Sequence, residues 1–159
     1  QVNNLSDAEY AVRSVKYPPK GIRGIAGATR ANNFGREIDY VSTADKNICV
    51  ICQIESVEAC KNIKEIASTE GVDLLFIGPG DLSADMGFIK NRSAAEVKEM
   101  AIQVLNETKK LNKPCGIMVS NITEAKEMLK IGFSVIAVTT DLVLLRNAVD
   151  EIGLLAKNN

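Results

Sequence analysis

The strongest constraint on the fold is a regular alternation of short apolar runs with segments of helical periodicity. The apolar runs cover residues 48–54, 72–77, 115–119 and 133–139. Helical spacing of apolar residues follows each run, over about 56–69, 93–111, 123–131 and 142–156. Runs rich in Ile, Val and Leu that alternate with helices are typical of a parallel sheet covered by helices. The sequence therefore predicts an α/β fold that forms one domain or part of one.

Two architectures contain four strand–helix units of this kind. One is a small doubly wound sheet that is complete in itself. The other is half of a (β/α)₈ barrel, which typically needs about 250 residues, whereas this chain has 159. Periodicity alone does not choose between the two.

The segment before the first apolar run is less regular. Residues 6–9, Ser-Asp-Ala-Glu, have the pattern of a capping box and predict a helix that ends near Lys16. The Pro- and Gly-containing stretch 17–21 stops this helix. We then expect a short strand over 22–26 and a helix around 38–44.

Charge and composition exclude some partners. The chain has 19 Lys and Arg against 20 Asp and Glu, so no basic excess exists to neutralise the phosphates of nucleic acids or membranes. No apolar run approaches the roughly 20 residues of a membrane span. We expect a cytoplasmic protein. Because the chain begins with Gln1 and not with Met, we also expect the true N-terminus to be missing.

Cysteine and histidine usage restricts the chemistry. Cys49 and Cys52 stand three residues apart in one predicted strand, so they point to opposite faces and cannot share a metal or a disulfide. We expect both to be reduced core residues, as in the cytoplasm. The chain contains no histidine, so it cannot by itself complete a mechanism that needs an imidazole base.

Two carboxylates follow two successive predicted strands. Glu55 directly follows the first, and Asp81 comes shortly after the second. The ends of neighbouring parallel strands lie about 5 Å apart, and carboxylates that close repel each other unless a cation separates them. Oxygen ligands select hard ions such as Mg²⁺ or Mn²⁺. The pattern therefore predicts part of a metal site, with solvated strand-end carboxylates as the alternative.

Three further features lie near these carboxylates. Gln53 interrupts the first apolar strand, and a buried amide needs a partner, which is either a bound ligand or a structural hydrogen bond. The Gly-Pro-Gly sequence at 78–80 predicts a turn whose backbone N–H groups can hold a carboxylate. Asp85 is interpreted as a surface or loop-capping acid.

Several sequence strings carry a family resemblance. They are YPPxGxRG at 17–24, QIE at 53–55, FIGPxDLSxxMG at 76–87, GIMVSN at 116–121 and AVxxD at 137–141. Together they closely resemble the HpcH/HpaI aldolase family of metal-dependent pyruvate aldolases, over essentially the whole chain. The resemblance implies a (β/α)₈ barrel of the phosphoenolpyruvate/pyruvate type. Residues 1–159 would then be the C-terminal part of one barrel domain, about strands five to eight with their helices.

The resemblance also implies roles for individual residues. Glu55 and Asp81 would bind a divalent metal (Mg²⁺, Mn²⁺ or Co²⁺), and Gln53 would contact the pyruvate oxo group or a metal-bound water. The other implied substrate contacts are the backbone of Gly80 and Asp81 and the side chains of Met118 and Thr140. The arginine and histidine that the family uses would lie in the first half of the barrel, so no catalytic set is complete in this chain.

The implied function is that of a carbon–carbon lyase. It is the reversible, metal-dependent aldol cleavage of a 4-hydroxy-2-oxo acid to pyruvate and an aldehyde. The expected small-molecule partner is the oxo acid or pyruvate. The expected protein partner is either further copies of the protein, which the family assembles as a trimer of dimers, or the missing first half of the barrel. The alternative is a non-catalytic half-barrel that acts as an interaction module.

Overall fold

A four-stranded parallel sheet forms the centre of the computed structural model, which describes residues 1–89 and 91–157. The strands are β1 (Ile51–Ile54), β2 (Leu74–Ile77), β3 (Cys115–Val119) and β4 (Val135–Val138). Every neighbouring pair is parallel, which confirms the predicted parallel α/β fold. The spatial order β1-β2-β3-β4 repeats the chain order, whereas a doubly wound sheet reverses its order at a switch point.

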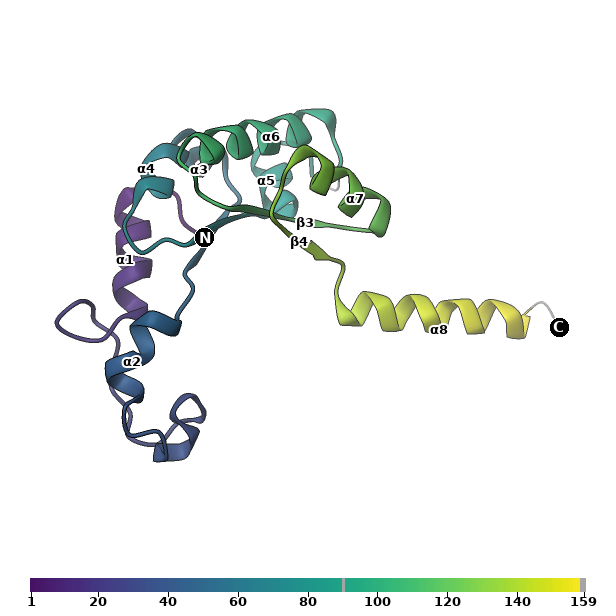
Figure 1. The fold of residues 1–159 in the computed structure, drawn as a ribbon. Helices are drawn as coiled ribbons and strands as arrows, with labels where there is room; N and C mark the ends of the chain where they lie inside the picture. Colours follow the sequence, from purple (N-terminus) through teal and green to yellow (C-terminus); the bar gives the residue numbers. More distant parts are fainter. Residues whose placement is uncertain (90, 158–159) are drawn as a thin grey trace.

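Helices lie in the connections between the strands, and further helices precede β1 and follow β4. They are α1 (Leu5–Val15), the 3₁₀ segment η1 (Arg30–Gly35), α2 (Tyr40–Asn47), α3 (Val57–Lys61), α4 (Ile63–Ser68), α5 (Pro79–Asp85), α6 (Ala95–Lys110), α7 (Ile122–Ile131) and α8 (Asp141–Lys157). Figure 1 shows α3, α4, α6 and α7 on one side of the sheet, with α8 extending away from the body. In the part of the chain that the structure describes, no helix is long and apolar enough to cross a membrane.

The core lies between these helices and one face of the sheet. The sheet contributes a layer of paired, buried side chains: Cys52 with Leu75, and Ile54 with Ile77. Ile66 of α4 and Val97 of α6 are buried in the same cluster. On the opposite face, Ile51 is 52% exposed and Val135 is 40% exposed. The sheet therefore has one face covered by helices and one open face.

The predicted strand over 22–26 is wrong. The backbone N–H of Ile22 donates to the carbonyl of Arg13 (2.8 Å), and that of Arg23 donates to the carbonyl of Lys16 (2.9 Å). The carbonyls at the end of a helix have no partner within the helix, and this segment supplies partners to those of α1. The N–H groups of Ile22 and Arg23 are therefore used locally and pair with no strand.

Local hydrogen bonds also move the element boundaries. Asn4 caps α1 by accepting from the N–H of Asp7 at 3.0 Å, so the predicted capping box at 6–9 is not the cap. The predicted helix over 56–69 is divided at Asn62 into α3 and α4. The residues that precede α6 and α7 are Ala94 and Asn121, where Ser93 and Thr123 were expected.

The first strand is shorter than the predicted 48–54. The carboxylate of Asp73 accepts from the N–H of Val50 at 2.7 Å, so a side chain takes the place of a strand partner there. Cys52 is buried as predicted, but Cys49 lies before β1 and is exposed. The prediction of a core position is therefore wrong for Cys49.

Candidate metal and substrate site

The sheet register brings the two predicted carboxylate positions to one edge. Ile54 pairs with Ile77, and the N–H of Gly78 donates to the carbonyl of Ile54 at 3.0 Å. Glu55, directly after β1, is buried with 9% exposed. Asp81 lies in the first turn of α5, just after β2, and is exposed. The predicted Gly-Pro-Gly turn is therefore the beginning of a helix.

Gln53 is joined to Glu55 by a short hydrogen bond. Its amide Nε2 donates to Oε2 of Glu55 at 2.6 Å. The two residues are two positions apart, so both belong to the open face of the sheet. Gln53 is exposed, and the expectation that this amide is buried is wrong. The amide orients the Glu55 carboxylate at the sheet edge.

Gly78 leaves the space in which these two side chains meet. A Cβ atom added to Gly78 would lie 2.8 Å from Nε2 of Gln53 and 2.9 Å from Oε2 of Glu55. Both distances are shorter than ordinary contacts of a Cβ atom. A side chain at this position would therefore displace the amide, the carboxylate or both.

Glu55 and Asp81 influence each other electrostatically. Burial raises the pKa of Glu55, and the negative charge of Asp81 raises it further, while the hydrogen bond from Gln53 acts in the opposite direction. The charge of Asp81 is thus near enough to Glu55 to contribute to its raised pKa. A cation bound between them would relieve the repulsion between the two charges.

The donor set fits a hard divalent ion. Both groups are carboxylates, whose oxygens suit Mg²⁺ and Mn²⁺. Within residues 1–89 and 91–157, no group of three or more His, Cys, Asp and Glu side chains lies close enough together to hold a metal ion. An ion at Glu55 and Asp81 would therefore keep positions for water and substrate, which is how Mg²⁺ is usually bound.

The first turn of α5 offers backbone donors beside this pair. N–H groups at the start of a helix have no partner within the helix, and those of Gly80 and Asp81 belong to this turn. A Cβ atom added to Gly80 would meet nothing within 4 Å. The space beside the Cα atom of Gly80 is therefore open.

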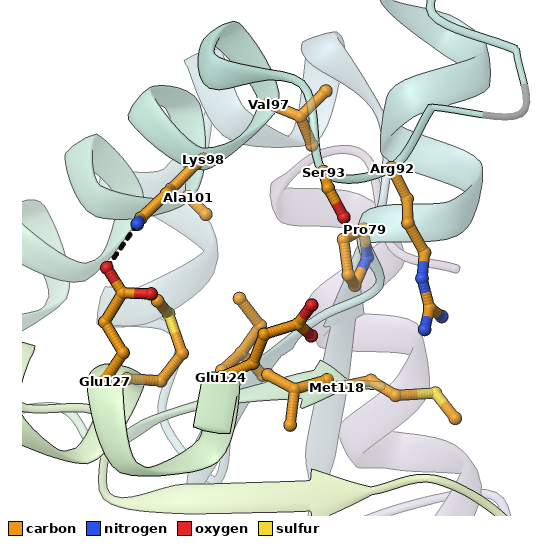
Figure 2. A pocket seen from close by; sticks show the side chains of 12 residues that line it. Pro79, Arg92, Ser93, Val97, Lys98, Ala101, Met118, Glu124 and Glu127 are labelled. Atoms are coloured by element: carbon orange, nitrogen blue, oxygen red, sulfur yellow. Dashed lines mark hydrogen bonds and ion pairs between the residues drawn. The ribbon is translucent and has the colours of Figure 1, made fainter. Parts of the chain in front are cut away.

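The other two predicted substrate contacts lie apart from this cluster. Met118 lines a cavity of about 170 Å³ between α6, α7, β3 and the start of α5 (Figure 2). Thr140 follows β4, where its hydroxyl accepts from the N–H of Val143 at 3.3 Å in the first turn of α8. The structure thus gathers Gln53, Glu55 and Asp81 and leaves Met118 and Thr140 at separate places on the same sheet edge.

Two further polar contacts lie near the site. Asp85 accepts from the N–H of Val57 at 2.7 Å, at the start of α3, in agreement with its interpretation as a capping acid. The guanidinium of Arg92 donates to the hydroxyl of Ser120, directly after β3. Sequence reasoning did not identify Arg92, because this residue lies in the connection between α5 and α6 and belongs to none of the motifs.

Comparisons with known proteins agree with the motifs. The HpcH/HpaI aldolase/citrate lyase family matches residues 1–148. The 5-keto-4-deoxy-D-glucarate aldolase of Shigella boydii serotype 18 is 39% identical over 152 residues, which cover 96% of this chain and 59% of the relative. The chain thus spans less than two thirds of that protein.

Solved structures give the same assignment. An HpcH/HpaI aldolase/citrate lyase family protein from Burkholderia cenocepacia J2315 has a TM-score of 0.92 and 32% identity, over 99% of this chain and 63% of that one. An HpcH/HpaI aldolase from Desulfitobacterium hafniense DCB-2 has a TM-score of 0.86 at 24% identity, over 99% and 62% of the two chains. At that identity the second likeness concerns the fold alone. This chain belongs to the HpcH/HpaI aldolase/citrate lyase family.

Proposed function

We propose that this chain is the C-terminal half of a (β/α)₈ barrel that cleaves a 4-hydroxy-2-oxo acid into pyruvate and an aldehyde with the help of a divalent metal. The observation that carries the proposal is the cluster of Gln53, Glu55 and Asp81 at the carboxyl edge of the sheet, in a member of an aldolase family. Active sites of (β/α)₈ barrels lie at this edge of the strands.

Three features support the half-barrel. The strand order repeats the chain order, as it does around a barrel. The inner face of the sheet is open, with Ile51 and Val135 exposed. The chain spans 63% of the structure from Burkholderia cenocepacia. Residues 1–159 are then strands five to eight, with their helices, of one barrel domain.

The proposed metal is Mg²⁺, Mn²⁺ or Co²⁺, held by Glu55 and Asp81. A divalent ion at this place would supply Lewis-acid stabilisation of the negative charge that develops on the oxygens of pyruvate. Gln53 fixes the orientation of the Glu55 carboxylate through its amide. The amide also stands on the open face, where it can meet the substrate oxo group or a water molecule.

The substrate carboxylate is received by the backbone at Gly80 and Asp81. The positive end of the α5 dipole favours an anion there, and the space beside Gly80 is open. Met118 and Thr140 line the remainder of the pocket in this proposal.

The cleavage step balances without a redox partner. A base removes the proton of the C4 hydroxyl, the C3–C4 bond breaks, and its electron pair remains on C3. C4 becomes the aldehyde carbon, and C3 then takes up a proton to become the methyl group of pyruvate. Because this chain contains no histidine, we assign the base to the first half of the barrel, where the family resemblance puts a histidine.

Pyruvate release tests the proposal. The assayed protein is the complete barrel, in which the first half precedes residues 1–159. It is incubated with a 4-hydroxy-2-oxo acid, and pyruvate release is followed by coupled NADH oxidation with lactate dehydrogenase. We expect activity that EDTA abolishes and that added Mg²⁺ or Mn²⁺ restores. Activity that survives exhaustive chelation, together with a borohydride-trapped pyruvate adduct, would overturn the metal-dependent mechanism in favour of a Schiff base.

One observation favours a second candidate for the separate 159-residue chain. A chain without histidine lacks the base that the mechanism needs, so by itself it acts as a non-catalytic half that associates with the other half or with further copies. Pyruvate release by the isolated chain would contradict this reading. We also propose a cytoplasmic location, which the buried free thiols of Cys52, Cys60 and Cys115 support.

A further inference from the structure

The segment before α1 lies against the end of β1, the strand that Glu55 follows. The backbone N–H of Val2 donates to the carbonyl of Gln53 at 3.3 Å, and the side chain of Val2 is buried. Figure 1 shows the N-terminus beside the sheet. The segment is therefore in direct contact with the residue two positions before Glu55.

Asn3 forms hydrogen bonds with the residues at both ends of α3. Its side-chain oxygen Oδ1 accepts from the hydroxyl of Ser56 at 2.6 Å, and its backbone carbonyl accepts from the side-chain amide of Asn62 at 2.9 Å. Ser56 caps the start of α3, and Asn62 follows its last residue. A residue 53 positions before Ser56 thus holds this short helix at both ends.

The hydroxyl of Ser56 both donates and accepts a hydrogen bond. A serine hydroxyl has one proton to donate, and Ser56 donates it to Asn3 while it accepts from the N–H of Ala59 at 3.0 Å. Ser56 is buried, with 7% exposed. A buried donor that loses its acceptor costs free energy, so the conformation of Ser56 depends on the side chain of Asn3.

Glu55 stands between the two residues that this segment anchors. Its carboxylate is oriented by the amide of Gln53, and its backbone runs directly into Ser56 at the start of α3. The amide of Gln53 therefore fixes the end of the Glu55 side chain, while the contacts of Asn3 fix the backbone from which that side chain extends. Residues that orient a metal ligand in this way affect metal affinity without touching the ion.

We infer that Asn3 is a positioning residue that holds Glu55 in the geometry that a divalent metal requires. The inference rests on the proposed function, in which Glu55 and Asp81 bind the ion. Asn3 acts through Ser56 and the backbone of Glu55. Without the Asn3 side chain, the hydroxyl of Ser56 loses its acceptor, the start of α3 is held less firmly, and the two carboxylates are less well arranged for one ion.

Mn²⁺ binding to the complete barrel, measured by isothermal titration calorimetry, tests the inference. Asn3→Ala removes the side-chain acceptor and keeps the backbone carbonyl to which Asn62 donates. We expect its affinity for Mn²⁺ to be about 10-fold weaker than that of the wild type, the lower end of the effect of residues that orient metal ligands. The titration is made well below the melting temperature of each variant, determined by circular dichroism.

Asn4→Ala is the matched control. Asn4 is the next residue, has the same side chain, and caps α1 by accepting from the N–H of Asp7 at 3.0 Å. Loss of a helix cap lowers stability, so this variant should melt at a lower temperature than the wild type. Because Asn4 does not bond α3 through its cap, its affinity for Mn²⁺ should be unchanged.

A double-mutant cycle separates positioning from a general loss of stability. Ser56→Ala removes the hydroxyl that donates to Asn3, and also the cap of α3, so it should weaken Mn²⁺ binding at least as much as Asn3→Ala. In the Ser56→Ala background, Asn3→Ala should have little further effect on affinity, because its partner is already absent. An Asn3 that only stabilised the fold would lower the melting temperature and leave the Mn²⁺ affinity of the folded protein unchanged.

The possible failures are distinguishable. If the wild-type barrel binds no Mn²⁺, the proposed metal site fails and this inference fails with it. If the wild type binds Mn²⁺ and Asn3→Ala keeps the wild-type affinity, the inference is overturned and the metal site stands. An equal loss of affinity in Asn4→Ala, or a full additional loss when Asn3→Ala is added to Ser56→Ala, would likewise overturn the assignment to the hydrogen bond between Asn3 and Ser56.

Discussion

The exposed apolar surface of α8 predicts that the 159-residue chain associates in solution when it is expressed alone. Six large apolar side chains of this helix are each between 57% and 72% exposed: Leu142, Leu144, Leu145, Val149, Ile152 and Leu154. The helix extends away from the body (Figure 1). The open face of the sheet adds Ile51 and Val135, and β4 presents a strand edge, a feature that recruits other chains.

The magnitude follows from the exposed fractions. Full burial of one Leu, Ile or Val side chain contributes about 1.5–3 kcal/mol. Covering the exposed parts of Leu145 (63%) and Ile152 (68%) therefore contributes about 3 kcal/mol in total. Replacing both residues with Glu should weaken self-association by roughly 100-fold in the dissociation constant.

Sedimentation equilibrium at micromolar concentration measures this effect. We expect the chain to sediment above its monomer mass of 17.2 kDa, and the Leu145→Glu, Ile152→Glu variant to shift towards the monomer. Asn147→Glu adds charge at an exposed polar position of α8 and should leave association unchanged. A cooperatively melting 17.2 kDa monomer of the unsubstituted chain would refute the reasoning and revive a self-contained doubly wound sheet.

Two other predictions concern the site and the buried thiols. Gly78→Ala should weaken Mn²⁺ binding about 10-fold, because the added Cβ would contact the Gln53 amide and the Glu55 carboxylate. The Cβ added by Gly80→Ala contacts no neighbouring atom within 4 Å, so this variant should retain its affinity for Mn²⁺. Isothermal titration calorimetry compares the two variants. Burial raises the pKa of Cys60 to about 11 and that of Cys115 to about 12, so the unfolded chain loses these protons first as pH rises. Stability should be full below about pH 8.5, the ordinary pKa of a thiol, and should fall progressively from there to about pH 12, as urea melts at each pH would show.

Each of these predictions has an outcome that contradicts it. Equal Mn²⁺ affinities of Gly78→Ala and Gly80→Ala would show that the contact at Gly78 does not position the carboxylate. For the thiols, Cys49 is exposed and supplies an internal comparison, because it should react with Ellman's reagent in the folded chain. If Cys60 and Cys115 reacted with Ellman's reagent as fast as Cys49 does, their burial would be contradicted.

The order and direction of the strands could be predicted because burial imposes a pattern on the sequence. The run at 115–119 has the bounds of β3, and the apolar side chains that face the helices form the core. The edge of the sheet at which Glu55 and Asp81 lie also follows from sequence, since parallel strands end at a common edge.

The remaining features depend on contacts that the sequence does not announce. The segment 22–26 is apolar enough for a strand, but its donors pair with the end of α1. Gln53 stands in an apolar strand, yet its face of the sheet is open, so it is exposed. Arg92 belongs to no motif and reaches Ser120 only because the fold brings the α5–α6 connection to the end of β3.

Metal titration tests the central claim most directly. Mn²⁺ binding to the complete barrel is followed by electron paramagnetic resonance for the wild-type protein and the variants Glu55→Gln, Asp81→Asn and Asp85→Asn. Asp85 is a neighbouring acid that caps α3 and is the matched control. We predict one bound ion in the wild type and in Asp85→Asn, with affinity at least about 10-fold weaker in Glu55→Gln and Asp81→Asn because each loses one of the two carboxylate ligands. Undiminished affinity in both ligand variants would contradict the account.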